Sequence, residues 1–543
     1  MFRQSLLESV KARLLHPQLQ ALPLHARIQR AIRQLILDGA LAPGNPLPAS
    51  RALAQSLGVS RDTVEAAYSH LHAEGFIERR VGSGSVVAAA TRLSPGRRGA
   101  GGPPRGGGAP RRGPRGEGVA AGGRARRAGR GRGGAGAPGR PPGRGGGGAP
   151  RGGGGAPRLS RRGEAMQAGG GVREQLVPRP FAPGVPETRT FPLATWERLQ
   201  RQVLKEYGAR ALTHGDPQGA EPLRQAIADY VNLERGARAT ADRVLVLTSS
   251  QQALGLCASV LLDAGERIFV EDPAYYGARK AFEAAGLECL PVPVDEQGLR
   301  PEPILAQPQA ARALCLTPSH HYPTGVTLSL ERRLALIEWA QRQQAWIIED
   351  DYDSEFHYAG RPTACVQGLD AHERTLYIGT FTKSLFPGLR IGYMVLPPAL
   401  VAPMTVARSL QDGHNASLAQ LTLARFIAGG HFGAYVRGMR NLYGERLGFL
   451  AERVGKCLGG LVEPRVPAGG LQMPGLLCAG IDETRAVAAA YRAGVELVGL
   501  SALHLAAPPR AGFLMGFAAY TTDELEAAVG VLAKTLRGLR TNP

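Results

Sequence analysis

The sequence of 543 residues lacks the features that mark membrane, secreted and metal-binding proteins. No apolar run approaches the roughly 18 residues that a membrane-spanning helix needs. The opening stretch MFRQSLLESVKARLL interrupts its apolar residues with charges, so it has no apolar signal-peptide core. The six cysteines occur singly, without a CxxC pair or the spacing of metal ligands. We therefore expect a cytoplasmic protein with reduced thiols, no membrane contact and no metal site.

Residues 91–178 are poor in large apolar side chains and consist mainly of Gly, Arg, Pro and Ala. Between Arg92 and Glu164 there are about 18 arginines, no lysine and two acids, which together contribute about +16 to the formal net charge of +20. The high overall charge therefore says little about the folded parts. Because little apolar surface is available to offset an ordering entropy of roughly 1–2 kcal/mol per residue, we predict a disordered linker over 91–178.

The segment before this linker has the pattern of a small helical domain. After an N-terminal segment (residues 1–20), apolar residues at helical spacing predict a helix whose inward face carries Leu24, Ile28, Ile32, Leu35 and Ile36. Two more helices follow: one that Ser50 can cap and Gly58 terminates, and one over SRDTVEAAYSHLHAEG that starts at a capping Ser60. Two short strand-like runs, FIERR and SVVAA, are joined by VGSG. This order predicts a winged helix-turn-helix over residues 21–90.

In such a domain the third helix enters the major groove of double-stranded DNA. We expect Arg61, Asp62 and Thr63, just after the capping Ser60, to lie nearest the bases, and Arg51 to lie near a phosphate. Residues of the glycine-tipped hairpin would form the wing: Arg79, Arg80, Gly82 and Gly84. The alternative is a three-helix bundle with solvated arginines, and the wing argues against it.

The segment LPASRALAQSLGVSRDTVEAAYSHLHAEGFIERRVGSGSVV resembles the GntR-type winged-helix domain of bacterial transcription regulators over its whole length. The resemblance rests on the LPxSRxLAxxLGVSRxTVxxAY core and the EGFIxxRxGSG wing. It implies binding to promoter DNA.

From residue 179 to 543 the sequence alternates apolar strand-like runs with amphipathic helical ones. The runs RVLVLT, RIFVED, ALCLTP, AWIIED and TLYIGT suit a parallel sheet covered on both faces. We therefore predict a large α/β domain. Ligands of such folds bind at the carboxyl ends of the strands, so the polar residues that follow these runs are the candidates for a site.

Four of these polar or aromatic residues match the needs of pyridoxal 5′-phosphate. Lys383, just after TLYIGTFT, can hold the aldehyde as a Schiff base. Asp350, in IIEDDYDSEF, can pair with the ring nitrogen, and Tyr352 can donate to the phenolic oxygen. Tyr275, after RIFVEDPA, can stack on the ring. Each residue alone is more often an ordinary surface or core residue, whereas the joint arrangement favours a cofactor site.

The phosphate of that cofactor needs backbone amides at a helix start, hydroxyls and a cation. The sequence offers Ser250 and Gln251 at the beginning of a helix, Thr380 beside Lys383, and Arg390 seven residues after it.

The motifs DPQG, SSQQALGL, EDPAYYG, TPSHHYPTG, IIEDDYDSEF and GTFTKSLFPGLRIGYMVLP resemble fold type I aminotransferases from about residue 180 to 540. Together with the GntR-type segment they resemble MocR-type transcription regulators over nearly the whole chain. That resemblance implies a homodimer whose large domains pair head to tail. It also implies that pyridoxal phosphate, or its adduct with an amine or amino-acid effector, changes how the DNA-binding domains are held.

Some positions depart from ordinary aminotransferases. Tyr322 stands where they carry Asn before Pro-Thr-Gly, with His320 as the nearest polar substitute, and His214 stands where a phosphate-reaching Tyr is common. Only Arg510 is offered for a substrate carboxylate. These departures disfavour efficient transamination, because an amino acid is poorly oriented when no arginine binds its carboxylate through two hydrogen bonds. Two alternatives remain open: an active aminotransferase with an accessory DNA-binding domain, and an RNA-associated protein that uses the Arg/Gly linker.

Overall fold

The computed structural model describes residues 2–14, 23–38, 40–80, 84–88, 159–172, 176–359, 364–478, 480–506 and 508–539. Residues Met1–Leu93 and Ser160–Pro543 belong to one compact unit. Most of the predicted linker, residues 91–158, lies outside the described residues. Within the described residues, no helix combines the length and apolarity needed to cross a membrane.

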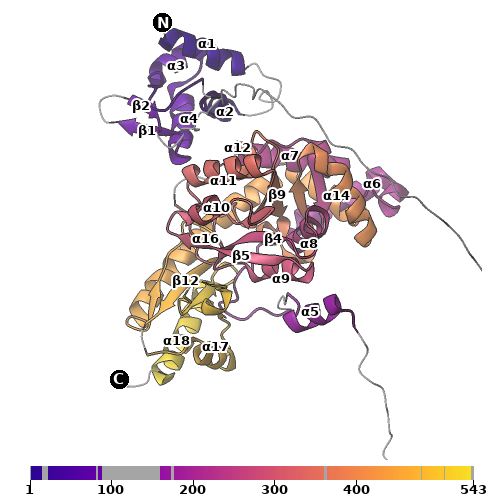
Figure 1. Cartoon of the computed structure of the whole chain (residues 1–543), viewed down its shortest axis with the longest axis vertical. Coiled ribbons are helices and arrows are strands. Elements are labelled where there is room, and N and C mark those ends of the chain that lie inside the picture. The colour runs from indigo at the N-terminus through magenta and orange to yellow at the C-terminus, as the bar shows by residue number, and fades with distance from the viewer. Residues whose placement is uncertain are drawn as a thin grey trace, which may run out of the picture. The chain divides into compact units, whose positions relative to one another are not determined.

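The N-terminal part has the predicted order of elements from residue 24 onward, whereas its first helix lies in the segment 1–20, for which no helix was predicted (Figure 1). Its helices and strands are α1 (Phe2–Leu14), α2 (Leu24–Leu37), α3 (Ser50–Leu57), α4 (Arg61–Ala73), β1 (Ile77–Arg80) and β2 (Gly84–Val87). β1 and β2 form an antiparallel hairpin in which Ile77 pairs with Val87. Ile28, Ile32, Leu35 and Ile36 are buried as predicted, whereas Leu24, the first residue of α2, is 39% exposed.

The large domain is built on an eight-stranded sheet in the order β3-β10-β9-β8-β7-β4-β5-β6. Its strands are β3 (Val244–Leu247), β4 (Arg267–Asp272), β5 (Glu288–Asp295), β6 (Gly298–Leu299), β7 (Ala313–Leu316), β8 (Trp346–Asp351), β9 (Thr375–Thr380) and β10 (Gly392–Val395). The pairs along β5, β4, β7, β8 and β9 are parallel. Strand β10 runs antiparallel to both of its neighbours, β9 and β3, so the sheet is mixed.

Helices cover both faces of this sheet, as the continuous apolar strands require. In Figure 1, α8 (Ser250–Leu261) and α9 (Tyr276–Ala284) lie on one side, and α11 (Leu330–Gln343) and α12 (Val366–Leu369) lie on the other. Alternate strand residues separate accordingly: Ile348 packs with the α8 side and Ile347 with the α11 side. The two faces of β8 therefore lead to different surroundings, which decides the roles of the acids at its end.

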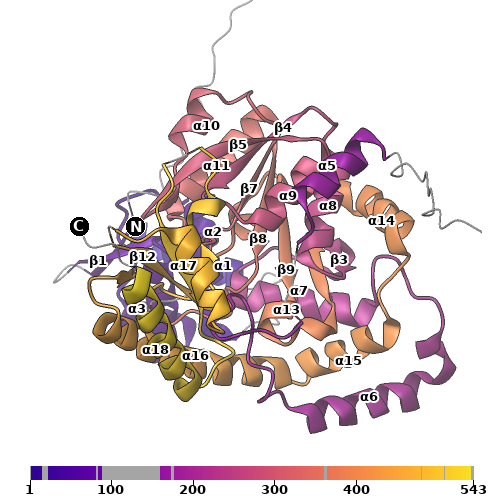
Figure 2. The same cartoon turned by 90° about the horizontal axis from the view of Figure 1, so that it is seen from below.

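Further helices complete this domain. They are α6 (Leu193–Tyr207), α7 (Glu221–Arg235), α10 (Glu302–Ala306), α13 (Phe381–Ser384), α14 (Pro398–Asp412) and α15 (Ser417–Ala428). Helix α6 runs beside α15 (Figure 2).

The C-terminal part forms a separate antiparallel sheet, in the order β11-β12-β14-β13, beside long helices (Figure 2). Its elements are α16 (His431–Cys457), β11 (Val462–Pro464), β12 (Gln472–Leu477), α17 (Glu483–Arg492), β13 (Val498–Gly499), β14 (Gly512–Gly516) and α18 (Thr522–Leu539). The carboxylate of Glu483 accepts hydrogen bonds from the amides of Ser501 and Gly512, which ties α17 to this sheet.

One helix lies where the sequence predicted linker. Helix α5 (Arg161–Gly169) begins at Ser160, whose hydroxyl accepts a hydrogen bond from the amide of Gly163. Arg162 Nε donates to the carbonyl of Ala284, at the end of α9, over 2.8 Å. The prediction of disorder up to residue 178 is therefore wrong for this stretch, because composition does not register a capped helix with contacts to another element.

Candidate functional site

The acidic run that begins in the last three residues of β8 separates by side-chain direction. Successive residues of a strand point to opposite faces, so Asp350 follows Ile348 to the α8 side, and Glu349 and Asp351 follow Ile347 to the other. Four of the five acids have partners. Glu349 accepts hydrogen bonds from the amides of Val366 and Gln367. Asp351 accepts hydrogen bonds from the side chains of Arg235, Tyr377 and Ser354. Asp353 pairs with His320, and Glu355 accepts a hydrogen bond from Tyr230.

Asp350 is the exception. Its side chain is buried, and its Oδ1 has no hydrogen-bond partner among the described residues. Burial raises the pKa of Asp350 to about 7; the charges of Asp351 and Asp353 add to that rise, and Lys383 opposes it. A buried carboxyl with an unused oxygen and a nearby amine is suited to a cationic hydrogen-bond donor that the chain itself does not supply.

Lys383 lies in the short helix α13, directly after β9. The hydroxyl of Thr380 caps this helix by accepting from the amide of Thr382. Lys383 Nζ donates to the carbonyl of Gly184 over 2.8 Å, and a Cβ built on Gly184 would lie 3.2 Å from that nitrogen. Gly184 has a φ of +70°, so a larger residue there would be strained and would crowd the amine.

Gln472, at the start of β12, brings the C-terminal sheet into the site. Its Nε2 donates to the hydroxyl of Tyr352 over 3.3 Å. Its Oε1 is buried without a partner and lies 3.8 Å from the position of a Cβ on Gly184. The sequence predicted neither Gly184 nor Gln472. Both come from segments far from Lys383 in the chain, and no spacing signal connects them to it.

Aromatic rings line the same region. The ring of Tyr275 lies 5.4 Å from that of Tyr322 at 76°, and Tyr322 lies 6.3 Å from Tyr352 at 77°. Tyr275 directly precedes α9, and a Cβ on Gly277 would lie 2.5 Å from its ring. Tyr322 thus connects Tyr275 and Tyr352 at the position where ordinary aminotransferases carry an asparagine.

The residues predicted to hold a phosphate lie at the N-terminus of α8 and after α13. Ser250 and Gln251 are the first two residues of α8, and Ser249, not Ser250, caps the helix by accepting from the amide of Gln252. Gln251 Nε2 donates to the carbonyl of Gly277, while its Oε1 is buried without a partner. Arg390 follows the short turn Pro387–Leu389 with an exposed side chain. A helix N-terminus with an arginine is a general anion site.

His320 supports the acidic run from the side. Its Nδ1 lies 2.9 Å from Asp353 Oδ1, and a Cβ on Gly469 would lie 2.2 Å from its Nε2. The ring is therefore held between Asp353 and the backbone at Gly469. This packing favours an indirect role through Asp353 over the predicted direct contact with a cofactor.

Two other predicted positions lie apart from these contacts. Arg510 is exposed in the loop that precedes β14. His214 is paired with His414, whose Nε2 lies 3.3 Å from His214 Nδ1 and accepts from the amide of Gly215 over 3.2 Å.

The unpaired atoms around Lys383 fit pyridoxal phosphate. The buried side-chain oxygens that have no hydrogen-bond partner among the described residues include those of Asp350, Asp353, Thr382, Gln251 and Gln472. A protonated ring nitrogen matches Asp350, and the first turn of α8 presents amides to a phosphate. Within the described residues, no cluster of histidine, cysteine and acidic side chains could hold a metal ion.

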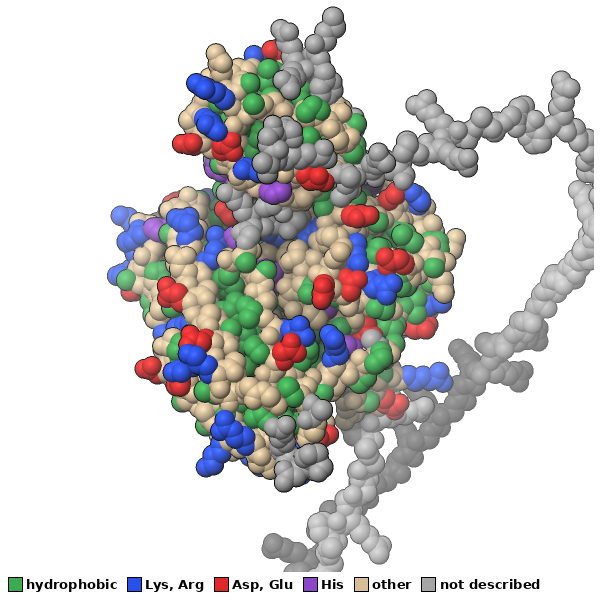
Figure 3. All heavy atoms as spheres, turned by 90° about the vertical axis from the view of Figure 1, so that its left-hand side faces the viewer, with side chains coloured by type: hydrophobic (Ala, Val, Ile, Leu, Met, Phe, Trp, Pro, Cys, Tyr) green, Lys and Arg blue, Asp and Glu red, His purple; other side chains and the backbone are tan. Residues whose placement is uncertain are grey.

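The predicted DNA-reading residues lie at the start of α4. Ser60 Oγ accepts from the amide of Thr63 over 3.2 Å, which confirms the predicted cap. Arg61 is 66% exposed and has only a long 3.9 Å contact with Glu65. Arg51 and Asp62 are exposed. In the predicted wing, Arg80 ends β1 and Gly84 begins β2 with a φ of +85°, while Gly82 lies outside the described residues. On the face drawn in Figure 3, acidic and basic side chains are interspersed.

Comparison with known proteins matches both parts of the chain. Residues 24–87 match the family of bacterial regulatory proteins of the gntR type, and residues 187–492 match aminotransferase class I and II. A probable rhizopine catabolism regulatory protein, MocR, from Rhizobium meliloti is 32% identical over 96% of this chain and 95% of its own length. The chain belongs to the MocR-type transcription regulators.

A second regulator agrees with this assignment, and a solved aminotransferase shares the fold of the large domain. The pyridoxine biosynthesis transcriptional regulator PdxR of Corynebacterium glutamicum is 28% identical over 92% of this chain and 93% of its own. The kynurenine aminotransferase of Pyrococcus horikoshii, solved with PMP, has a TM-score of 0.63 and 26% identity over 71% of this chain and 96% of its own. This MocR-type regulator thus carries a GntR-type DNA-binding domain and an aminotransferase-like domain of a fold that binds pyridoxal phosphate.

Proposed function

We propose that this protein is a transcription regulator that binds pyridoxal 5′-phosphate covalently through Lys383 and senses the cofactor, or its adduct with an amine or amino acid. The observation that carries the proposal is Asp350, a buried carboxyl beside Lys383 with an unused oxygen and a raised pKa. Pyridoxal phosphate would supply a protonated ring nitrogen, which is the donor that this oxygen lacks.

The other residues position that cofactor. Tyr275 would cover one face of the ring, and Tyr352, held by Gln472, would donate to the phenolic oxygen. The first turn of α8, with Ser250 and Gln251, would receive the phosphate together with Thr380 and Arg390. Promoter DNA would bind at the start of α4, and two copies of the chain would assemble head to tail through their large domains.

An active aminotransferase remains the second candidate, because the solved structures that the large domain resembles include aminotransferases. The exposed position of Arg510 speaks against it, since a substrate carboxylate held at the surface gains little from a single solvated arginine.

Borohydride reduction of the full-length protein incubated with pyridoxal phosphate tests the proposal. We expect one reduced adduct, on the peptide that contains Lys383. Amino-acid turnover should be near zero under conditions where the protein binds promoter fragments specifically. Label on other lysines alone would refute the covalent site. Sustained turnover by a protein that does not discriminate promoter from random DNA would favour the aminotransferase.

The DNA-reading prediction concerns Arg61. If Arg61 contacts a base edge, Arg61→Ala should weaken binding to the specific site by about 1–3 kcal/mol and leave binding to random DNA nearly unchanged. Arg51→Ala is the matched control, because a phosphate contact should weaken both kinds of DNA alike. Titrations of both variants against both DNAs at one salt concentration decide this. Equal losses for Arg61→Ala would make it a phosphate contact too.

A further inference from the structure

The C-terminal sheet presents one of its faces to the candidate site. Gln472 of β12 is paired two residues beyond Leu514 of β14, so both side chains lie on the same face, and Val498 of β13 is paired with Leu514. The alternate residues Met473 and Met515 belong to the hydrophobic core on the other face. The face that brings Gln472 into the site therefore continues through apolar side chains.

A small apolar cluster covers this face. Tyr276 and Tyr322 belong to it and are half-buried, and their ring centroids lie 5.3 Å and 5.4 Å from that of Tyr275. The buried members of the cluster are Leu500, Leu503 and Leu514, and Tyr276, Tyr322, Leu476 and Val498 pack against them. These members are all apolar or aromatic, so the site meets the C-terminal sheet across two tyrosine rings backed by leucines.

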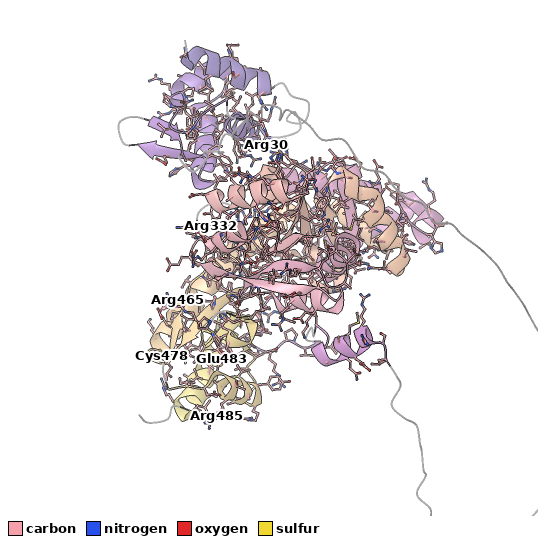
Figure 4. The ribbon with its side chains drawn as sticks, in the orientation of Figure 1. Arg30, Arg332, Arg465, Cys478, Glu483 and Arg485 are labelled. Carbon is pink, nitrogen blue, oxygen red and sulfur yellow. The ribbon has the colours of Figure 1, made fainter. Side chains whose placement is uncertain are left out.

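The charged groups beside this cluster already have partners. Glu483, labelled in Figure 4, accepts a hydrogen bond from the amide of Gly512 in β14 over 2.7 Å. Lys280 Nζ lies 5.5 Å from the centre of the Tyr276 ring and donates to the carbonyl of Gly171 over 3.1 Å. The carboxylate of Glu483 adds negative charge near the cluster, and the ammonium of Lys280 is shared between a carbonyl and an aromatic face.

Two carbonyl oxygens lie close to the point where the cofactor would be attached. Lys383 Nζ donates to the carbonyl of Gly184 over 2.8 Å. A Cβ on Gly184 would lie 3.8 Å from Gln472 Oε1, which is buried without a hydrogen-bond partner among the described residues. Carbonyl oxygens attract a protonated amine and repel a carboxylate. An amino acid carries its carboxylate on the carbon next to its nitrogen, so that carboxylate would enter these surroundings.

We infer that the effector of this regulator is a primary amine with an uncharged, apolar or aromatic remainder, and that Tyr276 and Tyr322 bind this remainder. The inference rests on the proposed function, because the amine would be held as its adduct with pyridoxal phosphate. A carboxylate that leaves water needs a paired cation, whereas an apolar group gains free energy by leaving water. The cluster and the two carbonyl oxygens therefore select against amino acids.

Three stable ligands test this selection on the full-length protein freed of bound cofactor. They are the reduced phosphopyridoxyl adducts of phenethylamine, L-phenylalanine and ethylamine, and the first two differ only by the carboxylate. In calorimetric titrations we expect the phenethylamine adduct to bind at least about ten-fold more tightly than the phenylalanine adduct. It should bind about three- to ten-fold more tightly than the ethylamine adduct, because only its ring reaches the tyrosines.

Tyr276→Ala tests the aromatic wall. The variant should bind the phenethylamine adduct about three- to ten-fold more weakly and the ethylamine adduct as tightly as the wild type does. Tyr491→Ala is the matched control, because it removes the same ring from a 50% exposed position on α17 that does not belong to the cluster. This control should bind all three adducts as the wild type does.

Each result decides a different statement. Equal affinity for the phenethylamine and phenylalanine adducts, or a preference for the latter, would overturn the assignment of the effector as an amine. A loss in Tyr276→Ala that is the same for both amine adducts would show that Tyr276 does not bind the remainder. A wild-type protein that binds no pyridoxal phosphate would refute the proposed function, whereas tight binding of pyridoxal phosphate without discrimination among the adducts would refute this inference alone.

Discussion

Asp350→Asn is expected to raise the unfolding free energy of the cofactor-free protein and to lower its affinity for the cofactor. In the free protein Asp350 has a pKa of about 7 instead of 3.8. A carboxyl whose pKa is raised by folding destabilises the native state once it ionises. This penalty is absent below about pH 4, grows between pH 4 and 7, and is complete above that range.

Asparagine removes this penalty, so the variant should gain up to about 4 kcal/mol of unfolding free energy at pH 8 and almost nothing at pH 4. It also removes the anionic partner of the ring nitrogen. Breaking a buried pair costs about 3–5 kcal/mol, so cofactor affinity should fall by roughly 100-fold or more. Urea unfolding of the free protein across this pH range, and titration with pyridoxal phosphate, measure the two effects separately.

Asp351→Asn is the control for the first effect. The ion pair with Arg235 and the hydrogen bonds from Tyr377 and Ser354 hold the pKa of Asp351 below its usual value, although burial opposes them. Its stabilising contribution is present above about pH 4 and is lost as the pH falls further. This variant should therefore be less stable at pH 8. If both variants shift stability in the same direction, the assignment of Asp350 as the unpaired acid is wrong.

The site residues at the ends of strands could be predicted, because the carboxyl ends of neighbouring strands meet at one edge of the sheet. Asp350 lies at the end of β8 and Tyr352 follows it, Lys383 follows β9, and Ser250 begins α8 after β3, so the strand pattern alone places them at one edge of the sheet. The sequence analysis selected Asp350, but the pattern alone does not show which of the acids in IIEDDYDSEF have partners. Their different partners become visible only when α7, α12 and the loop at Ser319 are in place.

The rest of the site depends on tertiary packing. Gly184 lies in a loop before α6, and Gln472 begins a strand of the second sheet, so no local spacing relates them to Lys383. The antiparallel direction of β10 is equally non-local, because its apolar run GYMV fits either direction. In contrast, the winged helix was predictable almost throughout, since its helices each carry an apolar face and a capping or terminating residue.

The ion pair between Arg235 and Asp351 should behave as a unit in a double-mutant cycle. Both side chains are almost completely buried, with Nε and Oδ2 2.7 Å apart. Arg235→Met keeps an unbranched side chain as far as the position of Nε but leaves Asp351 as a buried charge without its counter-ion, and this should cost about 3–5 kcal/mol at pH 7.5. Asp351→Asn should be destabilising too, because it leaves a buried guanidinium unpaired.

The double variant Arg235→Met/Asp351→Asn contains neither charge and keeps an acceptor for the hydroxyl of Tyr377. It should therefore recover most of the lost stability, giving a favourable interaction energy of about 2–3 kcal/mol in urea unfolding of the cofactor-free protein. The destabilisation in Arg235→Met should also shrink as the pH is lowered, because Asp351 without arginine beside it takes up a proton more readily. Additive losses in the double variant would contradict a coupled pair.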